Sequence, residues 1–467
     1  MIVGSSSRTW ESQAKFYMWK LKNLGIFVLL LAIIAIASGI NGSFVDPANL
    51  KTLIRDTSLY GLISLGVAMV IITGGIDLSI GSMIALCGVM LVQVVNIRYE
   101  AADFSSQIRS IASADSDPAA AADAIPPAVR DRAGDSSVVL LADPPPPLRD
   151  GDRLVYRTTI GESFLNVSGT IDHAGRTFLT SRDSVRMLNA GTTVSLSQIR
   201  YTPPVLACAM VLAFAAMLGL IHGLLITRVH LQPFVVTLCG LLIYRGLARV
   251  WTGDDQVGLQ SALSGFKSLV TGAAFSLPLP GIGKISGVSE SWTEIVWVDF
   301  PVTGVLLAIV AVLGWLFLNR TVWGRHLLAA GENEQAARYS GVATDKLIVL
   351  AYVVCGFLAG LAGILFTLEW NSVQPGSSGN FYELYAIAAA VLGGCSLRGG
   401  RGAVLGVIAG AAVMRCLYKA IVVLGIPQEW EMVIIGLALL SSVALDEAVL
   451  RYVVRSAKRG SKVNSVA

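Results

Sequence analysis

The chain has 467 residues, of which 54% are hydrophobic and only 14% are charged, and its mean hydropathy is +0.67. Soluble domains carry about 25% charged residues, so this composition excludes an ordinary soluble enzyme and indicates an integral membrane protein. The formal net charge of +4 is interpreted as a sign of membrane orientation and not of nucleic-acid binding.

Ten apolar runs approach the length of about 20 residues that a helix needs to cross a bilayer. They are residues 24–40, 58–73, 82–97, 204–226, 234–251, 302–318, 347–368, 384–397, 403–424 and 432–445. The predicted fold class is an all-α polytopic membrane protein with about ten transmembrane helices and a small extracytoplasmic β-rich insert.

Basic residues in short loops predict the orientation, because Lys and Arg concentrate on the cytoplasmic side. Those that fall on one side are Arg8, Lys15, Lys20, Lys22, Arg228, Arg320, Arg325, Arg338, Lys346, Arg398, Arg401, Arg451, Arg455, Lys458, Arg459 and Lys462. The opposite short loops carry only Lys51 and Arg55. Both termini are therefore predicted to be cytoplasmic, and the first run is interpreted as a retained span because no small-residue cleavage site follows it.

Changes in composition along the chain predict the domain organisation. The segments are 1–97 with spans one to three, 98–200 as an extracytoplasmic insert, 201–252 with spans four and five, 253–295 as an extracytoplasmic loop, 296–446 with spans six to ten and a cytoplasmic loop at 319–346, and 447–467 as a cytoplasmic tail. The insert begins with an Ala- and Asp-rich stretch that ends in four prolines at 144–147 and is predicted to be disordered. Strands near 154–159, 164–170, 176–180 and 193–199 then predict a small β module.

Cysteine and histidine positions favour no metal site. The cysteines are Cys87, Cys208, Cys239, Cys355, Cys395 and Cys416, and the histidines are His173, His222, His230 and His326. The cysteines lie in or beside apolar runs without paired spacing, which predicts neither disulfides nor a zinc site. The histidines are scattered and are interpreted as structural polar residues.

A polar segment at 324–341, GRHLLAAGENEQAARYSG, separates two apolar runs. Within it Glu334, Ala336, Ala337 and Gly341 resemble the Glu-Ala-Ala loop in the membrane subunits of ATP-binding-cassette importers. Two alanines leave a helix flat enough to fit a partner's groove, Glu334 and Arg338 would set its register, and the glycine ends it. By itself the pattern fits an amphipathic connector equally well.

Three further stretches resemble the ribose, xylose and galactose permease family, and they occur in the family's order. Residues 62–86, LISLGVAMVIITGGIDLSIGSMIAL, resemble its Gly-Gly-Ile-Asp-Leu-Ser segment. Residues 223–247, GLLITRVHLQPFVVTLCGLLIYRGL, resemble its Pro-Phe-hydrophobic-Val-Thr-Leu stretch, and 383–406, ELYAIAAAVLGGCSLRGGRGAVLG, its glycine-rich late segment. The insert at 98–200 departs from the family's short loop.

The resemblance implies a permease subunit of a sugar importer in a bacterial cytoplasmic (inner) membrane. Its implied partners are a second copy or homologue, two ATP-binding subunits, an extracytoplasmic sugar-binding protein and membrane lipid, but no nucleic acid. The sequence contains no G-x-x-x-x-G-K-[ST] loop, since Gly283-Lys284 is followed by Ile285 and has Pro278 where the first glycine belongs. The chain is therefore expected to have no catalytic residues and no cofactor, with ATP bound by a partner.

Other functions remain open. The chain could be a permease for another small polar solute, or a secondary carrier, which would need ion-coupling carboxylates within its spans. A membrane-anchored enzyme or receptor that acts through the insert is a third interpretation. The insert contains no cysteine and no nucleophile motif, so catalysis there is not favoured.

Polar residues within the apolar runs are candidates for a translocation path or a structural role, because buried charges in membranes need partners. Asp77 lies at a break between two runs, where it either caps the next helix together with Ser79 or contacts substrate. Arg245 either lines the path or pairs with Asp254 or Glu383. Hydrogen-bonding and aromatic groups suited to a neutral sugar are Ser58, Tyr60, Phe234 and Thr237.

Glycines recur in the later runs at intervals of three and four. Candidate packing positions are Gly74, Gly75, Gly356, Gly360, Gly363, Gly393, Gly394, Gly402, Gly406 and Gly410. Small residues at this spacing let membrane helices approach closely. Hinge motion is the alternative role.

Overall fold

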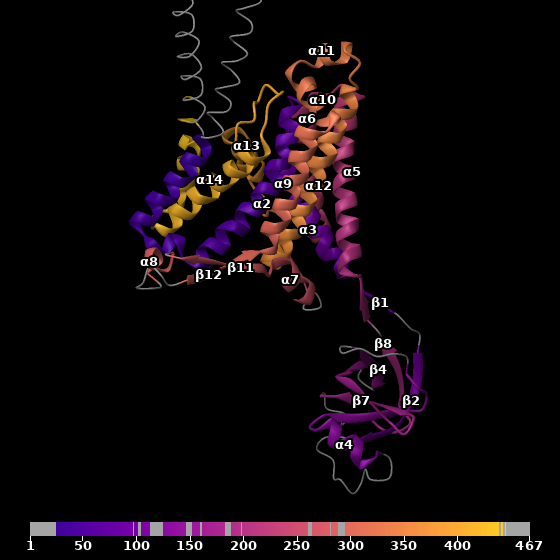
Figure 1. The fold of residues 1–467 in the computed structure, drawn as a ribbon. Coiled ribbons are helices and arrows are strands. Elements are labelled where there is room, and N and C mark those ends of the chain that lie inside the picture. The colour runs from indigo at the N-terminus through magenta and orange to yellow at the C-terminus, as the bar shows by residue number, and fades with distance from the viewer. Residues whose placement is uncertain are drawn as a thin grey trace, which may run out of the picture. The chain divides into compact units, whose positions relative to one another are not determined.

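The computed structural model describes residues 25–96, 98–100, 104–112, 125–145, 152–158, 161–182, 188–197, 199–259, 264–280, 282–287, 295–438, 440, 441 and 444. The chain forms two compact units (Figure 1). One is built from residues 1–94 and 204–467, and the other from residues 95–203. The predicted tail at 447–467 and the basic residues before residue 25 lie outside the described residues.

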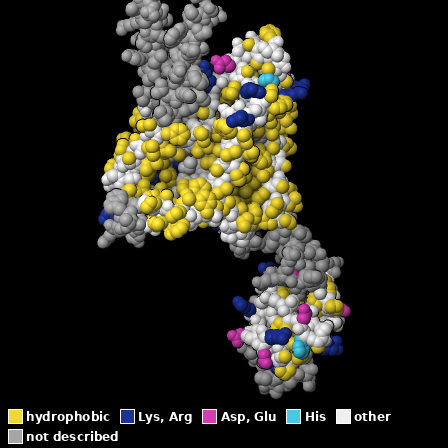
Figure 2. All heavy atoms as spheres, viewed as in Figure 1, with side chains coloured by type: hydrophobic (Ala, Val, Ile, Leu, Met, Phe, Trp, Pro, Cys, Tyr) yellow, Lys and Arg dark blue, Asp and Glu magenta, His cyan; other side chains and the backbone are white. Residues whose placement is uncertain are grey.

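The first unit is a bundle of helices. Its helices are Gly25–Ile40, α2 (Pro47–Ile72), α3 (Ile80–Val95), α5 (Pro204–Thr227), α6 (Pro233–Thr252), α9 (Val302–Arg320), α12 (Thr344–Trp370), α13 (Tyr382–Leu392), α14 (Val404–Val423) and residues 431–438. Among the described residues six of them, α2, α5, α6, α9, α12 and α14, are long and apolar enough to cross a membrane. Hydrophobic side chains cover much of the middle of the visible face of this unit, whereas charged side chains appear toward one end (Figure 2). Such an apolar band fits a surface that contacts lipid.

Helix α2 begins eleven residues before the apolar run predicted at 58–73. Pro47 occupies its first turn and the Asp46 side chain accepts a hydrogen bond from the amide of Ala48 at 3.0 Å, which is a favourable start for a helix. Lys51 and Arg55 therefore lie in a helix, so their prediction as loop residues was wrong. Hydropathy missed the first part of α2 because charged residues lower it. The helix tolerates these charges because they have partners elsewhere in the fold.

The segment predicted as an irregular loop at 253–295 contains regular structure. Its elements are β10 (Val257–Gly258), α7 (Ser264–Thr271), β11 (Ala273–Pro280), α8 (Ile282–Ser286) and β12 (Ile295–Pro301). Strands β11 and β12 pair in antiparallel fashion, with a register irregularity between Ala273 and Phe275. They lie at the end of the bundle opposite α10 (Val322–Glu332) and α11 (Glu334–Tyr339) (Figure 1).

One ion pair joins β12 to the start of α2. The Lys51 ammonium donates to Asp299 Oδ2 at 2.9 Å, and the Ser276 hydroxyl donates to Oδ1 at 2.7 Å. These hydrogen bonds, that of Lys51 first, lower the pKa of Asp299 below its ordinary value.

This lowered pKa predicts a small acid-dependent loss of stability. A carboxyl group whose pKa is lower in the folded state stabilises the fold above its unfolded-state pKa of about 3.9. That contribution disappears as the pH falls through the lowered folded-state value. Melting temperatures in detergent are expected to be lower for Asp299→Asn than for the unmodified protein at pH 7, and the difference should shrink below about pH 4. A constant difference from pH 7 to pH 3 would contradict this assignment.

The second unit contains a seven-stranded antiparallel sheet. Its strands are β2 (Phe104–Ala112), β3 (Ser137–Leu141), β4 (Arg153–Thr158), β5 (Gly161–Asn166), β6 (Gly169–His173), β7 (Arg176–Ser181) and β8 (Thr193–Ser197), in the order β5-β4-β8-β2-β3-β7-β6. A short pair, β1 (Arg98–Glu100) and β9 (Ile199–Tyr201), joins the two ends of the insert. The single strand predicted at 164–170 is two strands in the structure.

Part of the region predicted to be disordered is folded. Strands β2 and β3 and helix α4 (Pro127–Ala133) all lie before the proline run, and residues 113–124 lie outside the described residues. All five residues of β3 are buried: Val139 and Leu141 join one hydrophobic cluster and Val138 and Leu140 another. The prediction of disorder was wrong for these elements. Their apolar residues are divided between two small clusters on the two faces of the sheet, so the mean hydropathy of the segment stays low.

Glycines let α12 pack closely against two neighbours. A Cβ added at Gly356 or Gly360 would clash with Ala215 of α5, whereas one at Gly363 would meet Ile84 and Cys87 of α3. The three glycines predicted to form one stripe therefore face two different helices. At 3.6 residues per turn Gly363 lies on nearly the same face as Gly356 but about 10 Å further along the helix, so the two glycines meet different neighbours at different levels of the bundle.

A second close contact joins α13 to α14. A Cβ at Gly393 would clash with the backbone of Gly406, and one at Gly410 with the carbonyl of Ala389. A Cβ at Gly402 would instead meet the side chain of Ile72 and the sulfur of Cys395. All six cysteines lie in the described part of the chain, and none of them forms a disulfide there.

Candidate functional site

The polar segment predicted as one helix consists of two helices, α10 and α11. They are separated at Asn333, whose φ of −157° and ψ of 100° are not helical. Its side chain accepts a hydrogen bond from the amide of Ala336 at 3.0 Å. Asparagine is a favoured N-cap, so this residue ends one helix and begins the next. Gly341 follows α11 with a φ of 83°, a conformation that favours glycine.

Arg338 joins α11 to the start of α12. Its guanidinium lies 3.0 Å from Glu334 and 2.6 Å from Asp345, and its Nε donates to the Thr344 hydroxyl at 3.2 Å. Both charges are engaged within the chain, where they fix the orientation of α11. The role of Glu334 and Arg338 in setting a partner's register stays a prediction.

This orientation decides which face of α11 is open. Ala337 is 7% exposed, whereas Tyr339 is 90% exposed and Gln335 and Ala336 are also exposed. Only one of the two alanines is therefore available to a partner, and the open face carries a protruding aromatic ring. We call Gln335, Ala336 and Tyr339 the α11 face. Lys, Arg, Asp and Glu side chains gather at the same end of the bundle (Figure 2).

Close backbone contacts hold α10 to the rest of the bundle. A Cβ at Gly331 would clash with the carbonyl of Ile72, the last residue of α2, and with the amide of Gly400. That amide donates to the Ile72 carbonyl at 2.9 Å. Gly74, two residues after Ile72, has a φ of 82°. The α10 helix, the end of α2 and the loop at 393–403 are thus in direct contact, so a displacement of α10 must move the other two.

Helices α3 and α13 are shorter than a membrane span. They have 16 and 11 residues, or about 24 and 17 Å at 1.5 Å per residue, against a hydrocarbon core of about 30 Å. A non-helical segment precedes each helix. The start of α3 lies against the segment before α13, where a Cβ at Gly81 would clash with the carbonyl of Gly379. In transporters, interrupted helices of this kind mark binding regions.

Side chains from other helices satisfy the backbone of these interruptions, as backbone in a membrane requires. The hydroxyls of Thr237 and Tyr352 each donate to the Ile76 carbonyl at 3.3 Å. Arg245 Nη1 donates to the carbonyls of Pro375 and Ser378, in the segment before α13. These three residues hold the non-helical segments in place.

The predicted partners of Arg245 need correction. Asp254 pairs with Arg249 at 2.6 Å, so an ion pair with Arg245 was a wrong prediction. Glu383 is 9% exposed and close enough to Arg245 for their charges to interact. The hydrogen bonds of Arg245 go to carbonyls instead.

Asp77 is fully enclosed, with 1% of its surface exposed. Its Oδ1 accepts hydrogen bonds from the amide and hydroxyl of Ser79, at 2.9 and 2.7 Å. Helix α3 begins at Ile80, so Ser79 is the residue at the N-cap and Asp77 stabilises it from two residues before. Nearby, His222 Nε2 lies 2.8 Å from the Tyr244 hydroxyl. The predicted capping contact between Asp77 and Ser79 is therefore present in the structure, and contact with substrate stays a prediction.

The remaining path candidates lie in different surroundings. Phe234 is 52% exposed on the outer face of α6, and Ser58 is buried with its hydroxyl bonded to the Ile54 carbonyl at 2.6 Å. Tyr60 packs against Tyr382, with 4.9 Å between ring centroids. The structure does not bring Phe234, Ser58 and Tyr60 into one cavity of the described residues.

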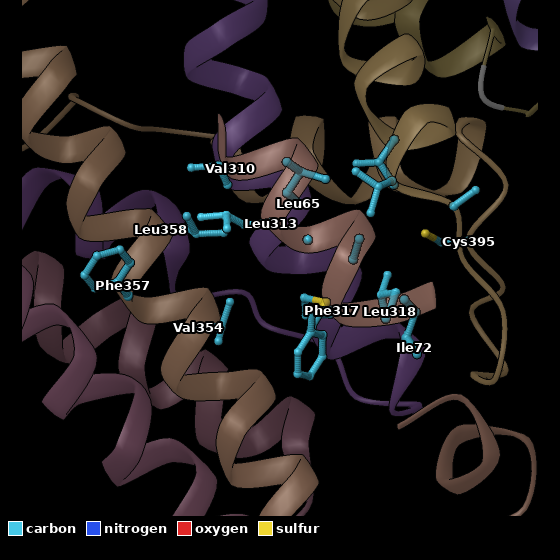
Figure 3. Close-up of a pocket in the computed structure, with 16 residues that line it drawn as sticks. Leu65, Ile72, Val310, Leu313, Phe317, Leu318, Val354, Phe357, Leu358 and Cys395 are labelled. Carbon is cyan, nitrogen blue, oxygen red and sulfur yellow. The ribbon is translucent and has the colours of Figure 1, made fainter. Parts of the chain in front are cut away.

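A cavity of about 290 Å³ opens among α2, α9, α12 and α14 (Figure 3). Its lining residues are Leu65, Ala68, Met69, Ile72, Val310, Leu313, Gly314, Phe317, Leu318, Val354, Phe357, Leu358, Cys395, Ala403, Val404 and Val407. None of them carries a charge, a hydroxyl or an amide side chain. A sugar would lose its hydrogen bonds to water there without replacement, so this cavity does not suit a polar solute.

Sequence analysis missed a group of charges within the helices. Asp56 Oδ2 lies 2.7 Å from Arg415 of α14, and Asp56 Oδ1 lies 3.3 Å from Arg55. Arg55 also pairs with Glu369 of α12. Arg415 stands inside an apolar run, and a charge in such a run was the available signal for a functional group. Its partners could not be identified from the sequence because they are far away in the chain.

Comparisons with known proteins identify related permeases. The family model described as "Branched-chain amino acid transport system / permease component" matches residues 181–443, which is just over half of the chain. The ribose import permease protein of Bacillus subtilis (strain 168) is 27% identical over 427 residues, covering 91% of this chain and 93% of that protein. That of Escherichia coli (strain K12) is 26% identical over 419 residues, covering 90% and 92%.

A third relative is named for the import of a different solute. The autoinducer 2 import system permease protein of Yersinia pestis (strain Pestoides F) is 34% identical over 241 residues, covering 51% of this chain and 61% of that protein. No solved structure matches. The fold described above therefore stands on this chain's own geometry.

Proposed function

Because the chain belongs to the permease family of the branched-chain amino acid transport system type, we propose that it is the membrane subunit of an ATP-binding-cassette importer for a monosaccharide such as ribose. The observation that carries this proposal is the similarity to ribose import permeases over nine-tenths of the chain. The neutral balance of charges between Asp56, Glu369, Arg55 and Arg415 supports a neutral solute. The autoinducer 2 relative supports another small polar solute as the alternative.

The proposed topology has about ten crossings with both termini in the cytoplasm. Helix α10, the end of α2 and the loop at 393–403 lie in contact, and two of these segments contain the basic residues Arg325, Arg398 and Arg401. Basic loops favour the cytoplasmic side. The insert at 98–200, which follows α3, would then be extracytoplasmic.

The proposed assembly contains a second permease copy or homologue, two ATP-binding subunits and an extracytoplasmic sugar-binding protein. ATP is bound by the partner subunits, so this chain is neither an ATPase nor the holder of a cofactor. The proposed contact with the ATPase includes Glu334, Ala336, Ala337, Arg338 and Gly341. Of these, Ala336 on the α11 face would touch the partner, and the others would shape and orient the helix.

In this mechanism ATP binding moves the α11 face with the ATPase, and the backbone contacts at Gly331 pass that motion to α2 and the loop at 393–403. Such coupling requires the docked helix to have different free energies in the two states of the permease. Asp77, Ser79, Thr237 and Arg245 would keep the interrupted helices rigid beside the path.

Reconstitution tests the function. Proteoliposomes that contain the permease, the ATPase and the sugar-binding protein are expected to accumulate labelled ribose only when ATP is supplied. Labelled leucine serves as the comparison solute, because the family description names branched-chain amino acids. Accumulation of leucine but not ribose would overturn the sugar assignment, and uphill uptake by the permease alone would indicate a secondary carrier.

A further inference from the structure

A second, smaller cavity lies where five helices of the bundle converge. It has a volume of about 50 Å³ and is lined by Asp56, Leu59, Tyr60 and Ile63 of α2, Ile84 of α3, Ala362, Phe366 and Trp370 of α12, Tyr382 of α13 and Arg415 of α14. In contrast to the apolar cavity, it contains a carboxylate, a guanidinium and two phenol hydroxyls. We call it the tyrosine cavity.

The charges at the tyrosine cavity cancel. Asp56 is shared between Arg415 and Arg55, and Arg55 also pairs with Glu369, so two cations face two carboxylates. An ionic solute would have to displace one of these pairs, and leaving a buried charge without its partner costs about 3–5 kcal/mol in other proteins. A neutral solute can bind without breaking them.

Aromatic rings form the rest of the wall. The ring centroid of Tyr382 lies 4.9 Å from that of Tyr60 and 5.9 Å from that of Phe366. The ring centroids of Phe366 and Trp370 are 5.9 Å apart. The electron-rich faces of such rings attract groups with slight positive charge, which include the C–H groups of a sugar ring. Phenol hydroxyls both donate and accept hydrogen bonds, as sugar hydroxyls do.

Two buried atoms of the ion-pair network have hydrogen-bonding capacity to spare. Among the residues that the structure describes, Arg415 Nε and Glu369 Oε2 have no hydrogen-bond partner. An unmet buried donor or acceptor is costly, so hydroxyl groups that reach this network would be favoured.

We propose that the tyrosine cavity is a transient binding site for a neutral polyhydroxylated ring, on the route of the solute through the permease. This inference rests on the proposed function. A volume of about 50 Å³ has room for a few water molecules, so a sugar enters only after a wall residue turns aside. Trp370 at the end of α12 is 62% exposed, so in this proposal it is the wall residue that turns aside.

Hydroxyl deletions test the site with little change in packing. Tyr60→Phe and Tyr382→Phe are each expected to lower the maximal rate of ATP-driven ribose uptake by about three- to tenfold in the reconstituted complex, since each removes one hydrogen bond. Tyr418→Phe is the matched control. The Arg415 guanidinium also lies over the Tyr418 ring, 4.4 Å from the ring centroid. The Tyr418 hydroxyl, however, accepts a hydrogen bond from Gln428 Nε2 at 3.4 Å, and Tyr418 does not line the cavity. Ribose uptake by Tyr418→Phe is expected to stay within twofold of that of the unmodified protein.

The outcomes separate this proposal from the proposed function. Melting temperatures are measured for all three variants, and folded protein at the assay temperature is required of each, so that a loss of uptake is not a loss of fold. If Tyr60→Phe and Tyr382→Phe transport ribose as fast as Tyr418→Phe, the binding site is overturned while the importer function stands. If the unmodified complex does not transport ribose, the proposed function fails first. As a second variant, Trp370→Ala is expected to alter the ribose uptake rate at least threefold, and an unchanged rate would overturn its role as the moving wall.

Discussion

A permease in which Tyr339 is replaced by aspartate is expected to fold and insert normally but to lose ATP-driven ribose uptake. Tyr339 is 90% exposed and makes no contribution to the buried core. Tyrosines of this kind often dominate protein interfaces, with losses of 2 kcal/mol or more on truncation, or about 30-fold in affinity. The measurement is uptake by the reconstituted complex, together with copurification of the ATPase subunit.

Two further variants distinguish docking from folding. Tyr339→Phe retains the ring and is expected to keep most of the uptake. Ala337→Asp places a charge at a position that is only 7% exposed, so it should lower the melting temperature of the permease itself. Normal uptake and ATPase binding by Tyr339→Asp would remove the α11 face as the docking surface.

The second large effect is expected at Asp56. Among the described residues Arg415 has one carboxylate partner, Asp56, whereas Asp56 also pairs with Arg55. Asp56→Asn therefore leaves the Arg415 guanidinium, whose side chain is 14% exposed, without a counter-charge. Breaking a buried pair in this way typically costs about 3–5 kcal/mol. Arg415→Gln leaves Asp56 with its second partner and is expected to cost less.

A double-mutant cycle checks this asymmetry. Thermal unfolding in detergent is measured for Asp56→Asn, Arg415→Gln and the double variant. The double variant should be more stable than Asp56→Asn alone, because no charge is then left unpaired at that position. Additive losses from the two substitutions would show that the pair does not interact.

The positions of most helices could be predicted because bilayer-spanning segments need long apolar runs. The predicted run at 204–226 corresponds to α5 at Pro204–Thr227, and that at 403–424 to α14 at Val404–Val423. The start of α2 was missed because Lys51 and Asp56 lower its hydropathy. Their partners, Asp299 and Arg415, lie far along the chain, and only folding brings them together.

The candidate site was predicted in outline but not in detail. The polar segment around Glu334 could be recognised from its residue types and from its place between two apolar runs. The sequence did not indicate that Ala337 faces inward while Tyr339 faces outward. That choice depends on Arg338, which pairs with Asp345 and so fixes the rotation of α11 relative to α12.

The amino-acid sequence by itself determined that this protein is a membrane permease, because the length and spacing of apolar runs and the order of short motifs are local properties of the chain. The tertiary structure alone decided where its polar groups act. Arg245 binds the carbonyls of Pro375 and Ser378, and Arg415 meets Asp56 and Tyr60, across more than a hundred residues. The physical reason is that a charge within a membrane must find its partner in space, and hydropathy along the chain records only that a charge is present.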